Sequence, residues 1–540
     1  KKYRNKQFTH ADTLRGSNTA ERRWWDVQRY DLTVQPDYAS KSSVGTNIIT
    51  YSVIPGKEQP GEMQIDLQDP LHIDKVTANG KKKLKFRQEG NAWFIATGKQ
   101  KEGSVNTVEI SFSGTPHEST RPPWSGGWTF TKDSLGRPWM TVTCQGLGAS
   151  IWYPCKDFQG DEPDKGASLT MITPDSLVAV SNGRQEFRKK NADGTVSTKW
   201  SVKNPISNYC LIPYIGKYVT FHEDYKGEKG QLDLDYWVLD YNLAKAKAYM
   251  PIEVRNMLGA FEYWFGPYPF YEDGYKLIDV EHTGMEHQSA VAYGNHYAPG
   301  YRGRDASGTG YAWDFIIIHE SGHEWFGNNI TTVDLADMYV HEGFTNYSET
   351  LFVEYLWGKE AGNSYNYGIR RGIRNDLPII PRYGVNEQGS GDMYPKAGNM
   401  LQTIRHSLDN DELWRSILRG LNSEFHNKTV TSDEIQKYVI SKSGFDYKPV
   451  FDQYLTDVKI PELQVYLSDD KKTFAYRYAN CNQNFNLPLV LKNDKSKLVL
   501  KPTVNWQKLN ITDEQFPLID RAAVERMYYL NQVTVMQNPF

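Results

Sequence analysis

The sequence predicts a multidomain α+β protein with β-rich segments at both ends and a mixed, helix-containing segment between them. Its 540 residues exceed what one hydrophobic core usually supports, so several domains are expected. Apolar and polar side chains alternate before about residue 220 and again after about residue 460, whereas helical spacing dominates between them. We therefore divide the chain into residues 1–220, 221–458 and 459–540.

The first segment has the pattern of a β-rich domain. Residues 29–34 and 47–54 combine two-residue alternation with β-branched side chains. Asn182-Gly183 and Asp193-Gly194 separate such runs and are typical of hairpin turns. We therefore expect antiparallel strands joined by short turns here.

The middle segment carries the helices. Helix formers with apolar residues at helical spacing fill residues 243–265, and similar patterns cover about 311–327, 339–357 and 396–421. Capping residues from Thr431 open a further helix. After about residue 460 the strand-like pattern returns and nothing helical is expected, so a large helical C-terminal domain is not predicted.

Composition excludes some function classes. The 62 basic and 65 acidic side chains give a net charge of −3 without a long basic run, so nucleic acid is not an expected partner. No segment approaches the roughly 20 apolar residues of a membrane span. The chain begins at Lys1 rather than Met, which favours export, for example to the periplasm, over the cytoplasm while leaving both open. The sequence does not indicate an oligomeric state.

The segment His319-Glu320-Ser321-Gly322-His323 predicts a zinc site. Positions i and i+4 share one helix face, so His319 and His323 can present two imidazoles to one Zn²⁺ ion per chain. Glu320 lies about 100° round the helix axis, free to act on water. A surface helix with solvated side chains is the alternative interpretation of this pattern.

Zinc in a catalytic site takes a third protein ligand and keeps one open position. Glu342 follows His323 after the eighteen-residue spacer 324–341, long enough for a loop and a returning helix. Glu349, two turns further on the same face, can accept a hydrogen bond from a ligand imidazole and fix its tautomer.

This spacing resembles the gluzincin metallopeptidases, and residues 323–328 and 341–344 narrow the resemblance to the M1 aminopeptidase family, which also contains a leukotriene epoxide hydrolase. The resemblance implies an N-terminal β-domain, a thermolysin-like catalytic domain and a small β-sandwich. It also implies hydrolysis of the first peptide bond of peptides with a free α-amine. Without a helical C-terminal domain, whatever encloses the cleft must be absent or come from another subunit.

Residues Thr283-Gly284-Met285-Glu286-His287 resemble the exopeptidase motif Gly-x-Met-Glu-Asn of this family. The resemblance implies that Glu286 captures the substrate's α-ammonium and that Gly284 and Met285 line the substrate. Thr283 and His287 depart from the family pattern, which leaves the local backbone geometry and charge open.

Two further segments support the resemblance. Residues 143–157 are similar to the N-domain segment whose Gln reaches the amine site, which implies substrate binding by Gln145. Residues 392–397 resemble the Tyr-x-Lys-Gly/Ala element, which implies that Tyr394 donates a hydrogen bond to the tetrahedral oxyanion.

Three other functions stay open at this stage. A thermolysin-type endopeptidase would share the zinc site but would cut amine-blocked peptides. Epoxide hydrolysis in the same pocket is separable only by assay. A non-catalytic binding protein that retains the fold would usually lose the base or a ligand, and none is lost here. The preferred N-terminal residue is not predicted.

Overall fold

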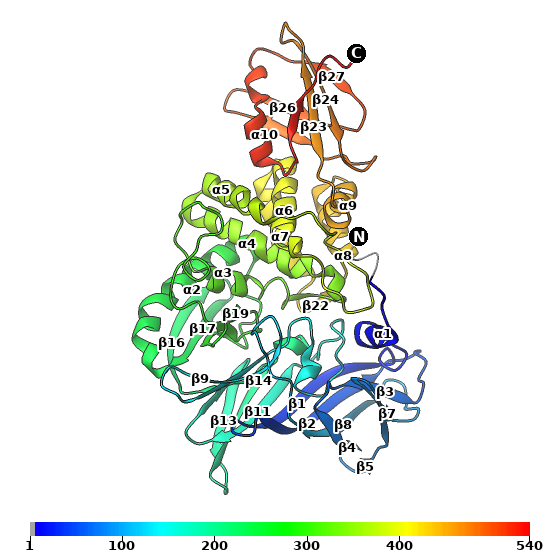
Figure 1. Cartoon of the computed structure of the whole chain (residues 1–540), viewed down its shortest axis with the longest axis vertical. Coiled ribbons are helices and arrows are strands. Elements are labelled where there is room, and N and C mark those ends of the chain that lie inside the picture. The colour runs from blue at the N-terminus through cyan, green and yellow to red at the C-terminus, as the bar shows by residue number, and fades with distance from the viewer. Residues whose placement is uncertain (1–5) are drawn as a thin grey trace.

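A computed structural model describes residues 6–540 and divides them into three regions stacked along the long axis of the molecule (Figure 1). A β-rich region containing the N-terminal strands lies at one end, a helical and mixed region lies in the middle, and a smaller β region lies at the other end. This arrangement confirms the predicted fold class. Lys1, from which processing was inferred, lies outside the described residues.

The N-terminal region is built on a strongly paired, mostly antiparallel sheet. Its order is β13 (Arg184–Lys190), β14 (Thr195–Val202), β11 (Ala167–Pro174), β1 (Trp25–Asp37), β2 (Ser42–Val53), β8 (Val105–Gly114), β4 (His72–Ala78) and β5 (Lys82–Lys83). A second sheet has the order β12 (Val178–Val180), β15 (Tyr214–Gly216), β10 (Pro138–Thr143) and β9 (Gly127–Lys132). A third joins β3 (Glu62–Asp66), β7 (Ala92–Ala96) and β6 (Phe86–Glu89), and helix α1 (His10–Gly16) precedes them all. Most buried apolar side chains of these sheets form one hydrophobic cluster, and Ala92 and Phe94 of β7 pack separately with Leu14 of α1.

The middle region combines a sheet with a helical layer. The sheet order is β16 (Tyr218–Gly227), β17 (Gly230–Leu239), β18 (Tyr275–Asp279), β20 (Val291–Tyr293) and β19 (Gly284–Met285). Its helices are α2 (Leu243–Phe265), α3 (Phe315–Gly322), α4 (Tyr339–Trp357), α5 (Lys359–Ile369), α6 (Pro395–Leu408), α7 (Asp411–Glu424), α8 (Ser432–Ser443) and α9 (Lys448–Thr456). The short strands β21 (Ile330–Thr332) and β22 (Lys428–Val430) pair in parallel.

The helices predicted at 243–265 and 339–357 have the expected bounds, whereas the segment predicted as one helix over 396–421 forms two. The pattern over 396–421 becomes α6 and α7 because Asp409 adopts a left-handed backbone with φ of 50°. Asn410 then starts α7, since its side chain accepts a hydrogen bond from the amide of Leu413. Helix α3 is shorter than predicted and ends at Gly322, before the second histidine.

The C-terminal region is mainly β. Strands β27 (Gln507–Asn510), β24 (Thr473–Ala479), β23 (Glu462–Leu467) and β28 (Val533–Val535) form one sheet, and β25 (Leu489–Lys492) pairs with β26 (Lys497–Leu500). A short helix, α10 (Arg521–Met527), corrects the expectation that nothing helical follows residue 460. Its start is capped by Asp520, which accepts from the amides of Ala522 and Ala523.

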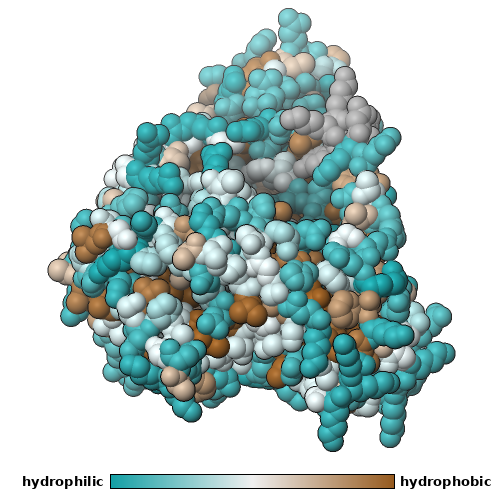
Figure 2. Space-filling view, turned by 60° about the horizontal axis from the view of Figure 1, so that its bottom comes forward, coloured by the Kyte–Doolittle hydropathy of each residue, from teal (hydrophilic) through white to brown (hydrophobic). Residues whose placement is uncertain are grey.

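The surface of the molecule is more polar than its core. The face seen in Figure 2 is mostly hydrophilic, with hydrophobic residues scattered among polar ones. Among the described helices, none has the length and apolar character needed to cross a membrane.

Candidate active site

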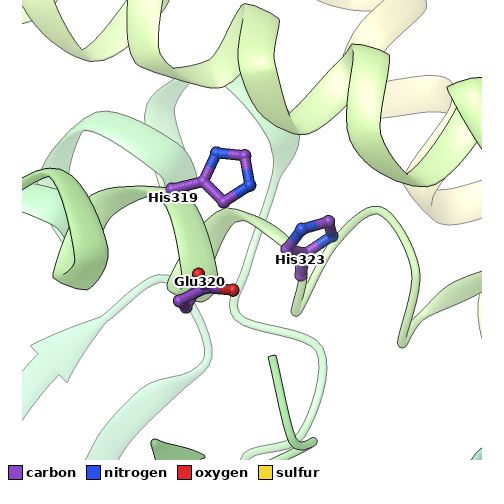
Figure 3. Close-up of side chains that lie close together, drawn as sticks. All are labelled: His319, Glu320 and His323. Carbon is purple, nitrogen blue, oxygen red and sulfur yellow. The ribbon is translucent and has the colours of Figure 1, made fainter. Parts of the chain in front are cut away.

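Helix α3 carries the first histidine of the site and is held by a buried cap. The Asp314 carboxylate, which is fully buried, accepts a hydrogen bond from the amide of Ile317 at 3.0 Å. Ile316, Ile317 and Ile318 are at most 2% exposed, so apolar packing fixes the orientation of the helix. His323 follows the last helical residue with a still helical backbone, and so remains beside His319 (Figure 3).

The structure brings His319, His323 and Glu342 together. Nε2 of His319 lies 3.5 Å from Oε2 of Glu342, and Nε2 of His323 lies 3.2 Å from the same atom. Within the described part of the chain, that oxygen is a buried acceptor without a well-formed hydrogen bond. Three ligand-type atoms that converge without satisfying one another fit a divalent ion bound between them.

The other nitrogen of each imidazole is held from behind. Nδ1 of His319 lies 2.7 Å from Oε1 of Glu349, where the sequence predicted a supporting carboxylate. Nδ1 of His323 lies 3.0 Å from the carbonyl oxygen of Phe326. With acceptors at both Nδ1 atoms, the neutral imidazoles would carry their protons there and direct their Nε2 lone pairs toward Glu342, as metal ligation requires.

Glu320 lies on the same helical ribbon as His319 but projects from a different side of it (Figure 3). One of its carboxylate oxygens lies within 4.8 Å of one ring nitrogen of His319 and one of His323. Burial raises the pKa of Glu320 to about 7, against the opposing attraction of His319. A carboxyl group with this pKa can exchange a proton near neutral pH.

Glu286 is the second buried acid of the site. Its Oε1 accepts a hydrogen bond of 2.6 Å from the Gln145 amide and one of 3.0 Å from the Tyr209 hydroxyl. The same Gln145 amide also donates to Oε1 of Glu342 at 3.1 Å. Gln145, from the N-terminal region, therefore links two carboxylates of the middle region. These belong to Glu286, directly after β19, and to Glu342 in α4.

Gly284 and Met285 form the edge strand β19 beside α3. A side chain at Gly284 would meet Cγ2 of Ile316 at 2.5 Å and Cγ of Glu320 at 3.3 Å. Only glycine lets this strand lie so close to the helix. Met285 is 5% exposed and lines a cavity that Glu286 and Glu320 also line.

Tyr394 reaches the site from the start of α6. Its ring lies 6.0 Å from that of His319 and is stacked with it at 28°. Burial, followed by the nearby Glu342 carboxylate, holds the pKa of Tyr394 well above its usual value, so the hydroxyl keeps its proton as a donor. Helices α4 and α6 approach closely because residue 343 is glycine: a Cβ there would lie 2.5 Å from that of Ala397.

The site residues predicted from the sequence line one cavity of about 470 Å³. Its lining includes four buried carboxylates, and these belong to Glu286, Glu320, Glu342 and Glu349. No Lys or Arg among residues 6–540 lines this cavity. Such an excess of buried negative charge is costly unless cations share the space.

Sequence patterns missed several residues that hold the site. Besides Tyr209, the side-chain amide of Asn328 donates to the Glu286 carbonyl at 2.8 Å. The Tyr365 hydroxyl donates to Oε2 of Glu349, and so supports His319 at one remove. Tyr365 follows Glu349 by sixteen residues, but no local pattern marks this contact.

Two protein-family descriptions match the chain. The Peptidase M1 N-terminal domain matches residues 27–210, and the Peptidase family M1 domain matches residues 250–454. These ranges fall on the N-terminal β region and on the region that carries the histidines.

Individual relatives are distant. The chain is 21% identical over 446 residues to leukotriene A-4 hydrolase of Xenopus laevis, which covers 77% of this chain and 68% of that protein. It is 20% identical over 439 residues to aminopeptidase M1 of Arabidopsis thaliana, covering 75% of this chain and 47% of the relative. It is 26% identical over 236 residues to aminopeptidase N of Canis lupus familiaris, covering 42% of this chain and 23% of the relative. The chain thus spans less than half the length of these two aminopeptidases.

Solved structures show the same fold. An M1 zinc metallopeptidase from Deinococcus radiodurans superposes with a TM-score of 0.67 at 18% identity, covering 82% of this chain and 95% of that one. A mutant of that enzyme bound to a Tyr-Ser-Ala substrate gives a TM-score of 0.66, with 81% and 95% covered.

Proposed function

Because the chain belongs to peptidase family M1, we propose that it removes single residues from the free N-terminus of peptides, with one zinc ion bound per chain. Its homologues in this family are aminopeptidases, hydrolases acting on peptide bonds, and the family implies zinc. The excess of buried carboxylates in the cavity is the observation that carries the proposal. A metal ion and a substrate ammonium group would both offset this negative charge.

The zinc ligands in this proposal are His319, His323 and Glu342. The unsatisfied Oε2 of Glu342 and the two Nε2 atoms facing it support this set. The chemistry that zinc supplies in such a site is Lewis-acid activation of water and of a carbonyl group. Glu349 and the Phe326 carbonyl orient the two imidazoles from behind.

Glu320 acts as the proton carrier. Its carboxylate, within 4.8 Å of both imidazoles, takes a proton from the attacking water and passes it to the leaving amine. Tyr394, at the start of α6, donates its hydroxyl hydrogen to the oxyanion that develops on the carbonyl.

Glu286 and Gln145 hold the α-ammonium group of the substrate. The Glu286 carboxylate is 2% exposed and accepts from two neutral donors, so an ammonium group would complete its partners. Holding the amine there allows only the first peptide bond to lie over the metal ligands.

The test is a matched pair of peptides that differ only in N-acetylation. We expect the zinc-loaded protein to release the first residue of the free peptide and to leave the acetylated one intact, as followed by mass spectrometry. Cleavage of both at internal bonds would instead identify a thermolysin-type endopeptidase. Cleavage of neither, with zinc bound, would contradict the aminopeptidase proposal, and an assay with a lipid epoxide would then separate an epoxide hydrolase from a binding protein.

A substitution pair sharpens this test. Glu286→Gln should lower kcat/KM for free peptides by about a hundredfold or more, because a charged hydrogen bond to the ammonium is lost. Glu281→Gln is the matched control, since Glu281 is an exposed carboxylate in the same segment. Equal activity of the two variants would contradict the assigned role of Glu286.

A further inference from the structure

Trp124 places a large aromatic side chain at the open side of the catalytic cavity. The residue is 58% exposed, although tryptophan is among the largest apolar side chains available to a core. Among the exposed large apolar residues of positions 6–540, Trp124 alone lines this cavity. Its neighbour Pro123 lines the cavity as well. An indole left uncovered beside a substrate-sized cavity offers contact area to a ligand.

Trp124 and Gln145 line the same cavity from the two sides of one hairpin of the N-terminal region. Strands β9 and β10 are antiparallel, and Gly127 pairs with Thr143 where the ladder ends. The chains stay together there, because a Cβ at Gly126 would lie 2.5 Å from Cδ1 of Leu147 and 3.2 Å from the Thr143 carbonyl oxygen. Trp124 therefore lies in the loop that leads into this ladder, and it lines the cavity together with Gln145, the residue that bridges Glu286 and Glu342.

The loop that presents the indole is ordered by its own hydrogen bonds. The Ser125 hydroxyl lies 2.7 Å from that of Ser119 and accepts from the Arg121 amide at 2.7 Å. The Ser119 amide donates to the Trp128 carbonyl at 2.7 Å. The Arg121 guanidinium lies 5.1 Å from the indole centroid, a cation–π contact that restricts the ring. Little conformational entropy is then lost when a substrate packs against Trp124.

The remaining walls near this side are uncharged. Met285 supplies an apolar surface, and Gln388 faces the Gly146 turn, with its Oε1 3.5 Å from a Cβ built there. A first residue with an acidic side chain would meet the carboxylates around Glu286, and no Lys or Arg among residues 6–540 lines the cavity to offset that charge. An aromatic or large apolar side chain would instead contact the indole and the thioether.

We propose that Trp124 is a specificity-determining residue that packs against the first side chain of the substrate and selects aromatic and other large apolar residues there. This inference rests on the proposed aminopeptidase function. It assigns to the loop between β8 and β9 a role in substrate choice and none in the chemical step.

The experiment compares kcat/KM for the p-nitroanilides of phenylalanine, leucine, alanine and glutamate. The zinc-loaded protein should prefer phenylalanine and leucine, and glutamate should be poorest. Trp124→Ala should lower kcat/KM for phenylalanine three- to tenfold, the size of an aromatic pair, and leave alanine within twofold. Trp124→Phe should recover most of the preference.

Leu135→Ala is the matched control, because Leu135 is 64% exposed in the turn of the same β9–β10 hairpin and outside the cavity. Thermal unfolding checks that Trp124→Ala is folded, and the inhibition constant of free L-phenylalanine gives a second measure that should rise in that variant. An unchanged ratio between phenylalanine and alanine would overturn this inference while leaving the aminopeptidase proposal intact. If the zinc-loaded protein cleaves no aminoacyl anilide or free peptide, the proposed function itself fails.

Discussion

Replacing Gly343 by alanine should disturb the site through helix packing alone. The added Cβ would lie 2.5 Å from the Ala397 Cβ and 3.0 Å from the Met393 carbonyl oxygen. Neither neighbour is the end of a flexible side chain, so α6 must move away from α4. Overpacking of this kind costs about 1–3 kcal/mol. Because Tyr394 directly follows Met393, its hydroxyl would be displaced from the position where an oxyanion forms.

We expect Gly343→Ala to lower kcat by roughly ten- to a hundredfold, since displacements near 1 Å can have that effect. Its melting temperature should fall by a few degrees, at roughly 2–4 °C per kcal/mol for a domain of this size. Steady-state kinetics and thermal unfolding measure the two effects. Gly391→Ala is the control, because a Cβ at Gly391 meets nothing within 4 Å, although it also lies close to Tyr394. Wild-type kcat and stability in Gly343→Ala would refute this packing argument.

Three other perturbations have defined outcomes. Glu320→Gln should abolish turnover while zinc content by atomic absorption stays unchanged, and a variant with wild-type activity would remove Glu320 from the mechanism. Glu349→Gln should weaken zinc binding about 10–100-fold in a competition titration with a chelator, because the carboxylate behind His319 is lost; unaltered affinity would contradict that role. For Asp411, partial burial opposes ionisation, but the hydrogen bonds and positive charges of Arg405 and Lys359 together outweigh it and lower the pKa to about 2. A lowered folded-state pKa stabilises the protein above the unfolded value near 4 and loses that contribution as pH falls toward 2. Asp411→Asn should therefore be less stable at pH 7 and show a weaker dependence between about pH 4 and 2 in urea unfolding, and an unchanged slope there would contradict the pairing.

The broad architecture was accessible from the sequence because each region repeats one periodicity over a long stretch. The helices at 243–265 and 339–357 have the bounds that their patterns predict. The pattern over 396–421 predicts one helix, because its helical spacing continues through Asp409. Only the left-handed backbone of Asp409 separates α6 from α7. Helix α10 has only 7 residues, which is too short for a helical periodicity to be recognised among the strand-like segments around it.

Turn chemistry misled the sequence interpretation at one place. Asp193-Gly194 does join the paired strands β13 and β14. Asn182-Gly183, however, links β12 to β13, which belong to different sheets. The Asn182 amide donates to the carbonyls of Cys210 and Gln288 and so ties two regions together. A dipeptide cannot distinguish a hairpin from such a crossing, because the partners are supplied by distant segments.

The candidate site divides in the same way. The positions of His319, His323, Glu342 and Glu349 could be predicted from their spacing alone, because these residues lie on or beside two helices that pack against each other. Glu286, Gln145 and Tyr394 could be assigned roles only through the family resemblance, and those roles stay proposals. Tyr209 and Trp124 carried no signal, because a tyrosine or tryptophan in a β-rich segment is ordinarily a core residue.

The most direct measurement of the central proposal is the anomalous scattering of a zinc-loaded crystal recorded at the zinc absorption edge. We predict one strong peak per chain, about 2.0–2.2 Å from Nε2 of His319, Nε2 of His323 and a carboxylate oxygen of Glu342. A peak bound elsewhere, or a zinc ion at the two histidines with Glu342 turned away, would contradict the proposed metal site.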